Sequence, residues 1–178
     1  QLGSELSSFQ RASIHFPMKC AVKEDSELIR RLLLLHEMVG LAAVVIHPTQ
    51  FDDTGLLTGI PLPWAVENME PGRCAGTNPD WFAPMLEQTD LGFCLDLQHC
   101  FQGDRSLKNA RIYREIFGDR LLQLHASAFS DAGHVTLHDR PEQSVILECI
   151  RDLEVPLVIE SAVDTPAKLR AEYDFLSA

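Results

Sequence analysis

Six short apolar runs in the sequence each end in a side chain that can bind a metal ion. These side chains, at or just beyond the ends of the runs, are His15, His47, Glu67, Asp96, His125 and Glu160. Burying a carboxylate costs several kcal/mol unless it is paired or binds a cation, and neither Lys nor Arg occupies these positions. Mixed Asp, Glu and neutral His ligands suit Mn²⁺, Zn²⁺, Fe²⁺ or Co²⁺. We therefore expect a divalent metal as cofactor and leave its identity open, Mg²⁺ included.

The elements that must position these side chains alternate between strands and helices. Apolar runs predict strands over residues 12–16, 41–46, 63–67, 91–95, 121–125 and 156–160. Helical spacing and end signals predict helices over residues 25–39, 80–88, 106–117, 141–153 and 165–176. Such alternation is typical of a parallel sheet, whose carboxyl ends lie together. A lone histidine at a strand end is more often a hydrogen-bonded bystander, but the same pattern at six ends favours a site.

These elements predict an α/β fold, a (β/α) TIM-type barrel formed by a single domain over residues 1–178. A complete barrel of this type takes eight strands and about 250 residues. With six predicted strands in 178 residues, either the first βα units are missing or two strands are not recognised, so the alternatives are a barrel short of the full eight strands and a complete one. A doubly wound open sheet is the competing architecture, but no glycine-rich phosphate loop follows any predicted strand.

Four motifs, in their order along the chain, resemble the xylose isomerase-like superfamily. They are Val45-Ile46-His47-Pro48, Ala65-Val66-Glu67-Asn68-Met69, Cys94-Leu95-Asp96-Leu97-Gln98-His99 and Val158-Ile159-Glu160. This superfamily of barrels includes sugar isomerases, sugar epimerases and endonuclease IV-type enzymes. The resemblance runs from about Ala12 to Val163, so it implies the same fold for nearly the whole chain.

The resemblance also implies a ligand set and a reaction. In the epimerases of the superfamily, Glu, Asp, His and Glu hold one metal, which implies Glu67, Asp96, His125 and Glu160 as ligands here. The two glutamates of those epimerases move the proton next to the substrate carbonyl through a metal-held enediolate. That catalytic role would fall to Glu67 and Glu160. A metal on the carbonyl and hydroxyl oxygens acidifies the intervening C–H, and a carboxylate on each face can move its proton.

Four further histidines are candidates for additional metal ions or for substrate binding. His99 lies where the superfamily places a histidine that touches substrate or a further metal. His15 and His47 resemble additional ligands of the endonuclease IV-type enzymes, which hydrolyse phosphodiesters with three metals. The segment from Asp131 to His134 is similar to the Asp and His of their third metal site, although its spacing is wider.

Three other polar residues near the motifs have open roles. Asn68 could hydrogen-bond a ligand, as residues around metal sites often do, or it could simply cap a turn. Arg73 and Arg105 each follow a motif strand and could bind a phosphate or carboxylate of a substrate. Surface loop arginines with no such role are commoner.

Three functions fit these residues. The first is a metal-dependent isomerase or epimerase with a small-molecule substrate, a sugar or a related polyol ketone. The alternative is an endonuclease IV-type multi-metal phosphodiester hydrolase, which a formal net charge of −11 disfavours because it repels phosphate backbones. For the same reason we expect no nucleic-acid partner. A non-catalytic barrel remnant is the third, and it would show incomplete ligation.

The remaining expectations concern the class of protein, membrane spans, location and oligomeric state. With 46% hydrophobic and 23% charged residues the chain is an ordinary globular protein. Its apolar runs are far shorter than the ~20 residues that cross a bilayer, so no membrane span is expected. Five cysteines without a CxxC pair predict reduced core residues in a cytoplasmic protein. An uncovered sheet edge invites association, so we expect a homo-oligomer.

Overall fold

Six parallel strands form the central sheet of the protein, in a computed structural model that describes residues 11–24, 26–131, 133–151 and 154–177. Each strand pairs with its neighbour in chain order, which gives the sheet order β1-β2-β3-β4-β5-β8. The strands are β1 (Ser13–His15), β2 (Ala43–Ile46), β3 (Trp64–Glu67), β4 (Gly92–Asp96), β5 (Leu121–Ala126) and β8 (Leu157–Ile159). This order has no reversal, whereas a doubly wound sheet has one. The doubly wound alternative is therefore excluded.

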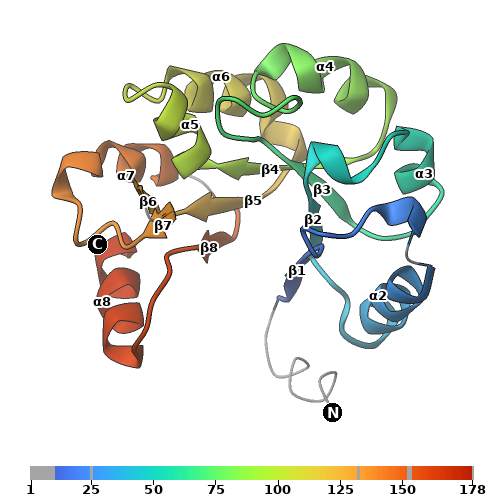
Figure 1. Cartoon of the computed structure of the whole chain (residues 1–178), viewed down its shortest axis with the longest axis horizontal. Helices are drawn as coiled ribbons and strands as arrows, with labels where there is room; N and C mark the ends of the chain where they lie inside the picture. The colour runs from blue at the N-terminus through green and yellow to red at the C-terminus, as the bar shows by residue number, and fades with distance from the viewer. Residues whose placement is uncertain (1–10, 25, 132, 152–153, 178) are drawn as a thin grey trace.

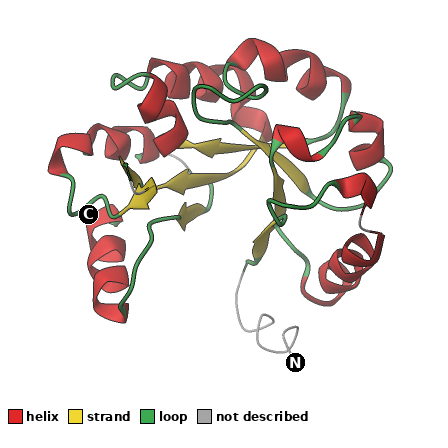
Figure 2. Ribbon diagram, in the orientation of Figure 1, coloured by secondary structure: helices red, strands yellow, loops and turns green. Residues whose placement is uncertain are grey.

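The sheet curls into part of a barrel, and most of the helices lie on its outer side (Figures 1 and 2). Within the described residues no strand pairs β8 with β1, so these two strands are the edges of the sheet. This confirms the predicted α/β barrel short of eight strands. The helices are α2 (Ser26–Val39), α3 (Thr54–Thr58), α4 (Pro79–Gln88), α5 (Leu97–Gly103), α6 (Lys108–Phe117), α7 (Val145–Ile150) and α8 (Pro166–Leu176).

Several short elements were not predicted from the sequence. They include α3, α5 and an antiparallel pair, β6 (Ala128–Ser130) with β7 (Gly133–Val135). The helix predicted over residues 141–153 is a 3-10 turn, η4 (Pro141–Gln143), followed by α7. Four residues within predicted segments lie outside the described residues: Asp25, Ala132, Asp152 and Leu153.

The two faces of the sheet carry side chains of different size. Val44 and Ile46 of β2 belong to the large core beneath the helices, where four rings from α4, β4 and α6 lie 5.1–6.3 Å apart. Ala43 and Val45 point the other way, into a small inner cluster with Ala65 and Cys94. Small side chains suit the concave face because neighbouring strands converge there.

Two expectations from composition concern cysteines and membranes. All five cysteines are unpaired, and Cys94, Cys100 and Cys149 are buried as predicted. Cys20 is half-buried and Cys74 is exposed, so the prediction of core positions is wrong for Cys74. In the described part of the chain, no helix has the length and apolarity that a bilayer span requires.

Candidate metal centre

The inner face of the sheet leads directly to the candidate site. Every second residue of a strand points the same way, so the inner cluster continues toward the carboxyl ends of the strands. Two positions beyond each small inner residue lies a polar one: His47 after Val45, Glu67 after Ala65 and Asp96 after Cys94. Asp96 is the register partner of His125 on the neighbouring strand. The predicted strand ends therefore converge because of strand periodicity and register.

Four of these side chains form one compact group. Glu67, Asp96, His125 and Glu160 each offer a ligand atom, and these four atoms lie within 4.8 Å of one another. The Nδ1 atom of His125 is 2.8 Å from Glu67 Oε1 and 2.8 Å from Glu160 Oε1. The structure thus brings together the four residues that the resemblance implied as metal ligands.

Several potential ligand atoms of the group are buried without a hydrogen bond of acceptable geometry. Glu67 Oε1 and His125 Nδ1 are buried and only 2.8 Å apart, yet neither makes a hydrogen bond of acceptable geometry to a described residue. Asp96 Oδ2 is also buried, and it too makes no hydrogen bond of acceptable geometry to a described residue. Ligand atoms about 2.1 Å from one ion lie about 3 Å apart when they subtend a right angle at it. The donor set and its spacing therefore fit a divalent cation.

The pKa values of these side chains also favour a bound cation. Burial raises the pKa of Asp96 to about 8. Burial also opposes ionisation of Glu67, but contacts with His125, His15 and His47 lower its pKa well below the usual value. Burial lowers the pKa of His125, but contacts with Cys94, Glu160 and Glu67 outweigh it and raise that pKa. Without metal the site therefore holds protons at neutral pH, and a divalent cation would displace them.

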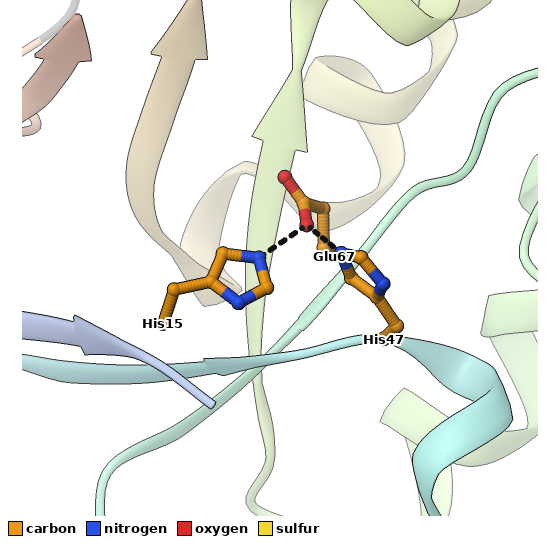
Figure 3. Close-up of side chains that lie close together, drawn as sticks. All are labelled: His15, His47 and Glu67. Atoms are coloured by element: carbon orange, nitrogen blue, oxygen red, sulfur yellow. Dashed lines mark hydrogen bonds and ion pairs between the residues drawn. The ribbon is translucent and has the colours of Figure 1, made fainter. Parts of the chain in front are cut away.

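A second group shares Glu67 with the first. His15 Nε2 is 3.1 Å and His47 Nε2 is 2.9 Å from Glu67 Oε2, and Figure 3 shows both rings directed at this oxygen. His15 ends β1, and His47 follows β2 at the start of a 3-10 turn, η2 (Pro48–Gln50). Imidazole nitrogens therefore lie close to both oxygens of Glu67. His125 is next to Oε1, and His15 and His47 are next to Oε2.

A third group shares Asp96. His99 and His134 each place a ring nitrogen within 4.8 Å of an Asp96 oxygen and of one another. His99 is buried on α5, whereas a solvent-facing loop was the alternative to a functional role. His134 lies on β7, where its Nδ1 is 2.8 Å from Ser127 Oγ. Asp131, proposed to accompany His134, is exposed and lies outside the candidate ligand groups of the described residues.

Asn68 fixes the backbone of a ligand. Its side-chain nitrogen donates to Asp96 O at 2.9 Å, and its side-chain oxygen accepts from Asp96 N at 2.7 Å. The Asp96 side chain in turn accepts from His99 N at 2.8 Å and so begins helix α5. Asn68 was expected either to hydrogen-bond a candidate ligand or to cap a turn, and these hydrogen bonds to the Asp96 backbone fit the first role.

Sequence reasoning missed four residues that support or line the site. Gln50 accepts from His47 N and donates to Pro17 O and Cys20 O, joining the loops after β1 and β2. Its position three residues after His47 is the spacing of a capping box and could have revealed it. No comparable sequence signal identifies the other three, which are Gln123 beside His125, Glu70 beside His99, and Glu172 on α8.

A cavity of about 440 Å³ opens over these groups, within the range of about 300–1,000 Å³ typical of small-molecule sites. It is lined by His15, His47, Glu67, His99, His134 and Glu160, among others. A larger cavity of about 850 Å³ lies at the amino ends of β3 to β5, but none of the eight predicted site residues lines it. We therefore take the smaller cavity as the candidate site, because predicted site residues line it and none lines the larger one.

No protein-family model and no curated protein matches the sequence. Eleven chains of solved structures do match the fold, and three of them are described here. The probable 3-DHS dehydratase AsbF, involved in petrobactin synthesis, from Bacillus anthracis has a TM-score of 0.65 at 13% identity, over 99% of this chain and 81% of that chain. The 3-keto-D-glucoside 4-epimerase YcjR from E. coli, in its apo form, has a TM-score of 0.59 at 12% identity, over 98% and 86%.

The third structure is a sugar phosphate isomerase/epimerase from Parabacteroides distasonis, with a TM-score of 0.53 at 15% identity, over 93% of this chain and 68% of that chain. This chain has the (β/α)-barrel fold of these three structures. At these identities the likeness is one of fold, and it confirms the fold that the four sequence motifs implied. In enzymes with this barrel fold the active site is at the carboxyl ends of the strands, where the candidate ligands lie here.

Proposed function

We propose that the protein is a metal-dependent isomerase or epimerase of a sugar or related polyol ketone. The observation that carries this proposal is the group of Glu67, Asp96, His125 and Glu160, of which Glu67 and Glu160 line a small-molecule cavity. The three sugar-modifying and dehydratase enzymes that share the fold support it. A remnant without activity would show a ligand set with gaps, whereas all four side chains are together.

The bound metal would polarise the carbonyl and hydroxyl oxygens of the substrate and so acidify the C–H bond between them. Glu160 is the better placed base, because its side chain is 22% exposed and lines the cavity. Its Oε1 is at His125, whereas its Oε2 has a looser neighbour, His134 Nδ1, at 3.7 Å. Glu160 would take the proton as the C–H bond breaks and the electron pair moves toward the carbonyl.

Glu67 has less freedom to move a proton. Its side chain is 1% exposed, and both its oxygens are in contact with histidines. We therefore assign Glu67 chiefly to holding the metal and Glu160 to proton transfer. A single mobile base returns the proton on the face from which it came, so this asymmetry favours aldose–ketose isomerisation over inversion at one carbon, which needs a base on each face.

The test combines metal analysis with isotope exchange. Metal per chain is measured on chelator-free protein, and aldoses and ketoses are then screened in D₂O for incorporation of deuterium next to the carbonyl. We expect one tightly held metal and exchange that Glu160→Gln abolishes, while the exposed Glu87→Gln on α4 leaves exchange intact. No metal after reconstitution, or exchange that survives Glu160→Gln, contradicts the proposal.

The second candidate is a multi-metal phosphodiester hydrolase. One observation favours it: three of the four candidate ligand groups, those described above, overlap through Glu67 and Asp96, as expected for adjacent ions that share carboxylates. The charge of the cavity opposes it, because Arg73 is the sole Lys or Arg among the described residues that line it. Two or three metals per chain together with hydrolysis of a bis(4-nitrophenyl) phosphate probe would establish this candidate instead.

A further inference from the structure

An exposed methionine lies at the mouth of the candidate cavity. Met18 follows β1, is 75% exposed and lines the same cavity as Glu160. The preceding residue, Pro17, is also exposed and lines this cavity. Covering apolar side chains removes their surface from water and so favours binding of whatever covers them. These two adjacent residues therefore offer uncovered apolar surface in the cavity that contains the candidate metal ligands.

The turn that carries Met18 is fixed at both ends. Cys20 N donates to Pro17 O at 3.0 Å, which closes a tight turn with Met18 at its first central position. The side-chain nitrogen of Gln50, a residue only 3% exposed, donates to Pro17 O at 2.8 Å and to Cys20 O at 3.1 Å. The backbone of Met18 is thus held in place before a ligand arrives, and a preorganised contact costs less ordering entropy on binding.

The same cavity offers no free cation to a charged group of a substrate among the described residues that line it. Arg73 is the sole Lys or Arg there, and its Nε and Nη2 atoms each lie 2.6 Å from Glu70 Oε1. Its positive charge is therefore balanced by a neighbouring carboxylate. The other arginine considered for substrate binding, Arg105, lies 4.7 Å over the Phe101 ring and does not line this cavity.

We propose that Pro17 and Met18 form an apolar subsite for the far end of the substrate, and that this end is uncharged and apolar, as in a sugar that terminates in a methyl group. The inference rests on the proposed function and narrows its substrate class to deoxy sugars and related ketones. A substrate held at the metal by its carbonyl and hydroxyl oxygens extends its other end toward the mouth, where Met18 is exposed. A hydroxyl against this surface would lose water without gaining a partner, and apolar pockets discriminate between such groups by roughly tenfold or more.

The experiment uses hydroxamic acids, which chelate a divalent ion through two neighbouring oxygens and carry a tail of chosen chemistry. Butano-, pentano- and hexanohydroxamic acid are each paired with the same chain bearing a terminal hydroxyl, and all are titrated calorimetrically into the metal-loaded protein. We expect roughly tenfold tighter binding of the apolar member in at least one pair. Met18→Ser should reduce this preference to about twofold or less, whereas Met18→Leu should retain it. Met38→Ser is the matched control, because Met38 is 65% exposed on α2 and does not line the cavity.

Two results overturn the inference. They are equal affinities within every pair, and a preference that Met18→Ser leaves unchanged. If Met18 instead covers a contact between two copies of the chain, Met18→Ser alters the sedimentation of the protein and leaves the preference as it was. A metal-loaded protein that binds hydroxamates without preference overturns only the subsite. A chain that takes up no metal, or binds no hydroxamate once loaded, fails the proposed function, and the subsite falls with it.

Discussion

Gln123 controls which nitrogen of His125 can bind a metal. His125 directs Nδ1 toward Glu67 and Glu160, so metal binding there requires the ring proton on Nε2. His125 Nε2 lies 2.6 Å from the side-chain nitrogen of Gln123. That nitrogen can only donate, whereas a half-turn of the amide would present its oxygen, an acceptor, to Nε2–H. Metal binding is therefore coupled to the orientation of one buried amide.

This coupling predicts opposite effects for two substitutions of Gln123. Gln123→Leu should weaken metal binding roughly 10- to 100-fold, the usual cost of losing such a supporting residue. Gln123→Glu supplies only acceptors and should bind metal at least as tightly as the natural chain. Competition with a chromophoric chelator measures both affinities, with Gln88→Leu on the exposed side of α4 as control. Equal affinities for the two Gln123 variants would contradict the coupling.

Asp96 makes the stability of the metal-free protein depend on pH. Burial raises the pKa of Asp96 from 3.8 to about 8, so between these values the folded chain keeps a proton that the unfolded chain has lost. Stability therefore falls as pH rises through this window.

We predict that the melting temperature of the metal-free protein falls from pH 5 to pH 8.5. Asp96→Asn has no carboxyl proton to lose and should flatten this dependence, whereas the exposed Asp119→Asn should not. Metal affinity should rise over the same interval, because the ion competes with fewer protons. Calorimetric melting in a chelator and in excess metal measures both effects. A metal-free melting temperature that rises with pH in this interval is the contrary result.

At the scale of elements, buried polar side chains join the segments that carry the ligands. Gln50 bridges the loops after β1 and β2, and Asn68 bridges β3 to β4. Glu172 of α8, fully buried, accepts from Leu137 N at 2.7 Å and from Ser161 Oγ at 2.8 Å. Ser161 follows Glu160, so Glu172 connects the last ligand to the segment beyond β7.

Glu172→Ala should lower the free energy of unfolding by about 2–4 kcal/mol, because it leaves several buried donors without an acceptor. It should also weaken metal binding through the loss of support for Glu160. Asp174→Ala, two residues further along the same helix and exposed, should stay within about 0.5 kcal/mol. Urea unfolding of the metal-free variants measures the change in the free energy of unfolding. A Glu172→Ala protein as stable as Asp174→Ala would show that the contacts contribute nothing.

Sequence patterns predicted the parts of the fold that depend on periodicity. Each of the six strands was recognised because its apolar run is bounded by polar or turn residues, and the candidate ligands lie at or just beyond the ends of these runs. Helix α5 was missed because it has seven residues and starts at the ligand Asp96 itself. Glu172 could not be predicted, because its partners lie up to 35 residues away and only the tertiary fold brings them together.

At the scale of the whole molecule, the candidate ligands span an open sheet from edge to edge. His15 belongs to β1 and Glu160 follows β8, the two strands that lack an outer partner within the described chain. Both strands have half-exposed side chains, in contrast to the fully buried β2, β3 and β4. An ion in the four-residue group would hold Glu160 to Glu67, and His15 of β1 contacts the other oxygen of Glu67, so the two edges would be linked through Glu67.

We predict that metal slows hydrogen exchange most at β1 and β8 and least at β3 and β4. An ion at 1,000 times its dissociation constant stabilises the folded state by about 4 kcal/mol. Mass spectrometry of exchange with and without a chelator would locate this protection. Protection spread evenly over the sheet would mean that metal stabilises the chain as a whole without connecting its edges.

The order of the ligands along the chain has a consequence for biosynthesis. Chains emerge from the ribosome amino terminus first, and His15, His47 and Glu67 already form a candidate ligand group of their own. A nascent chain can thus offer an ion three ligands long before Glu160 is translated. An ion taken up at that stage would reach its final set only when β8 joins the sheet. A polypeptide cut short before residue 160 would keep this candidate ligand group and lack Glu160, the proposed base.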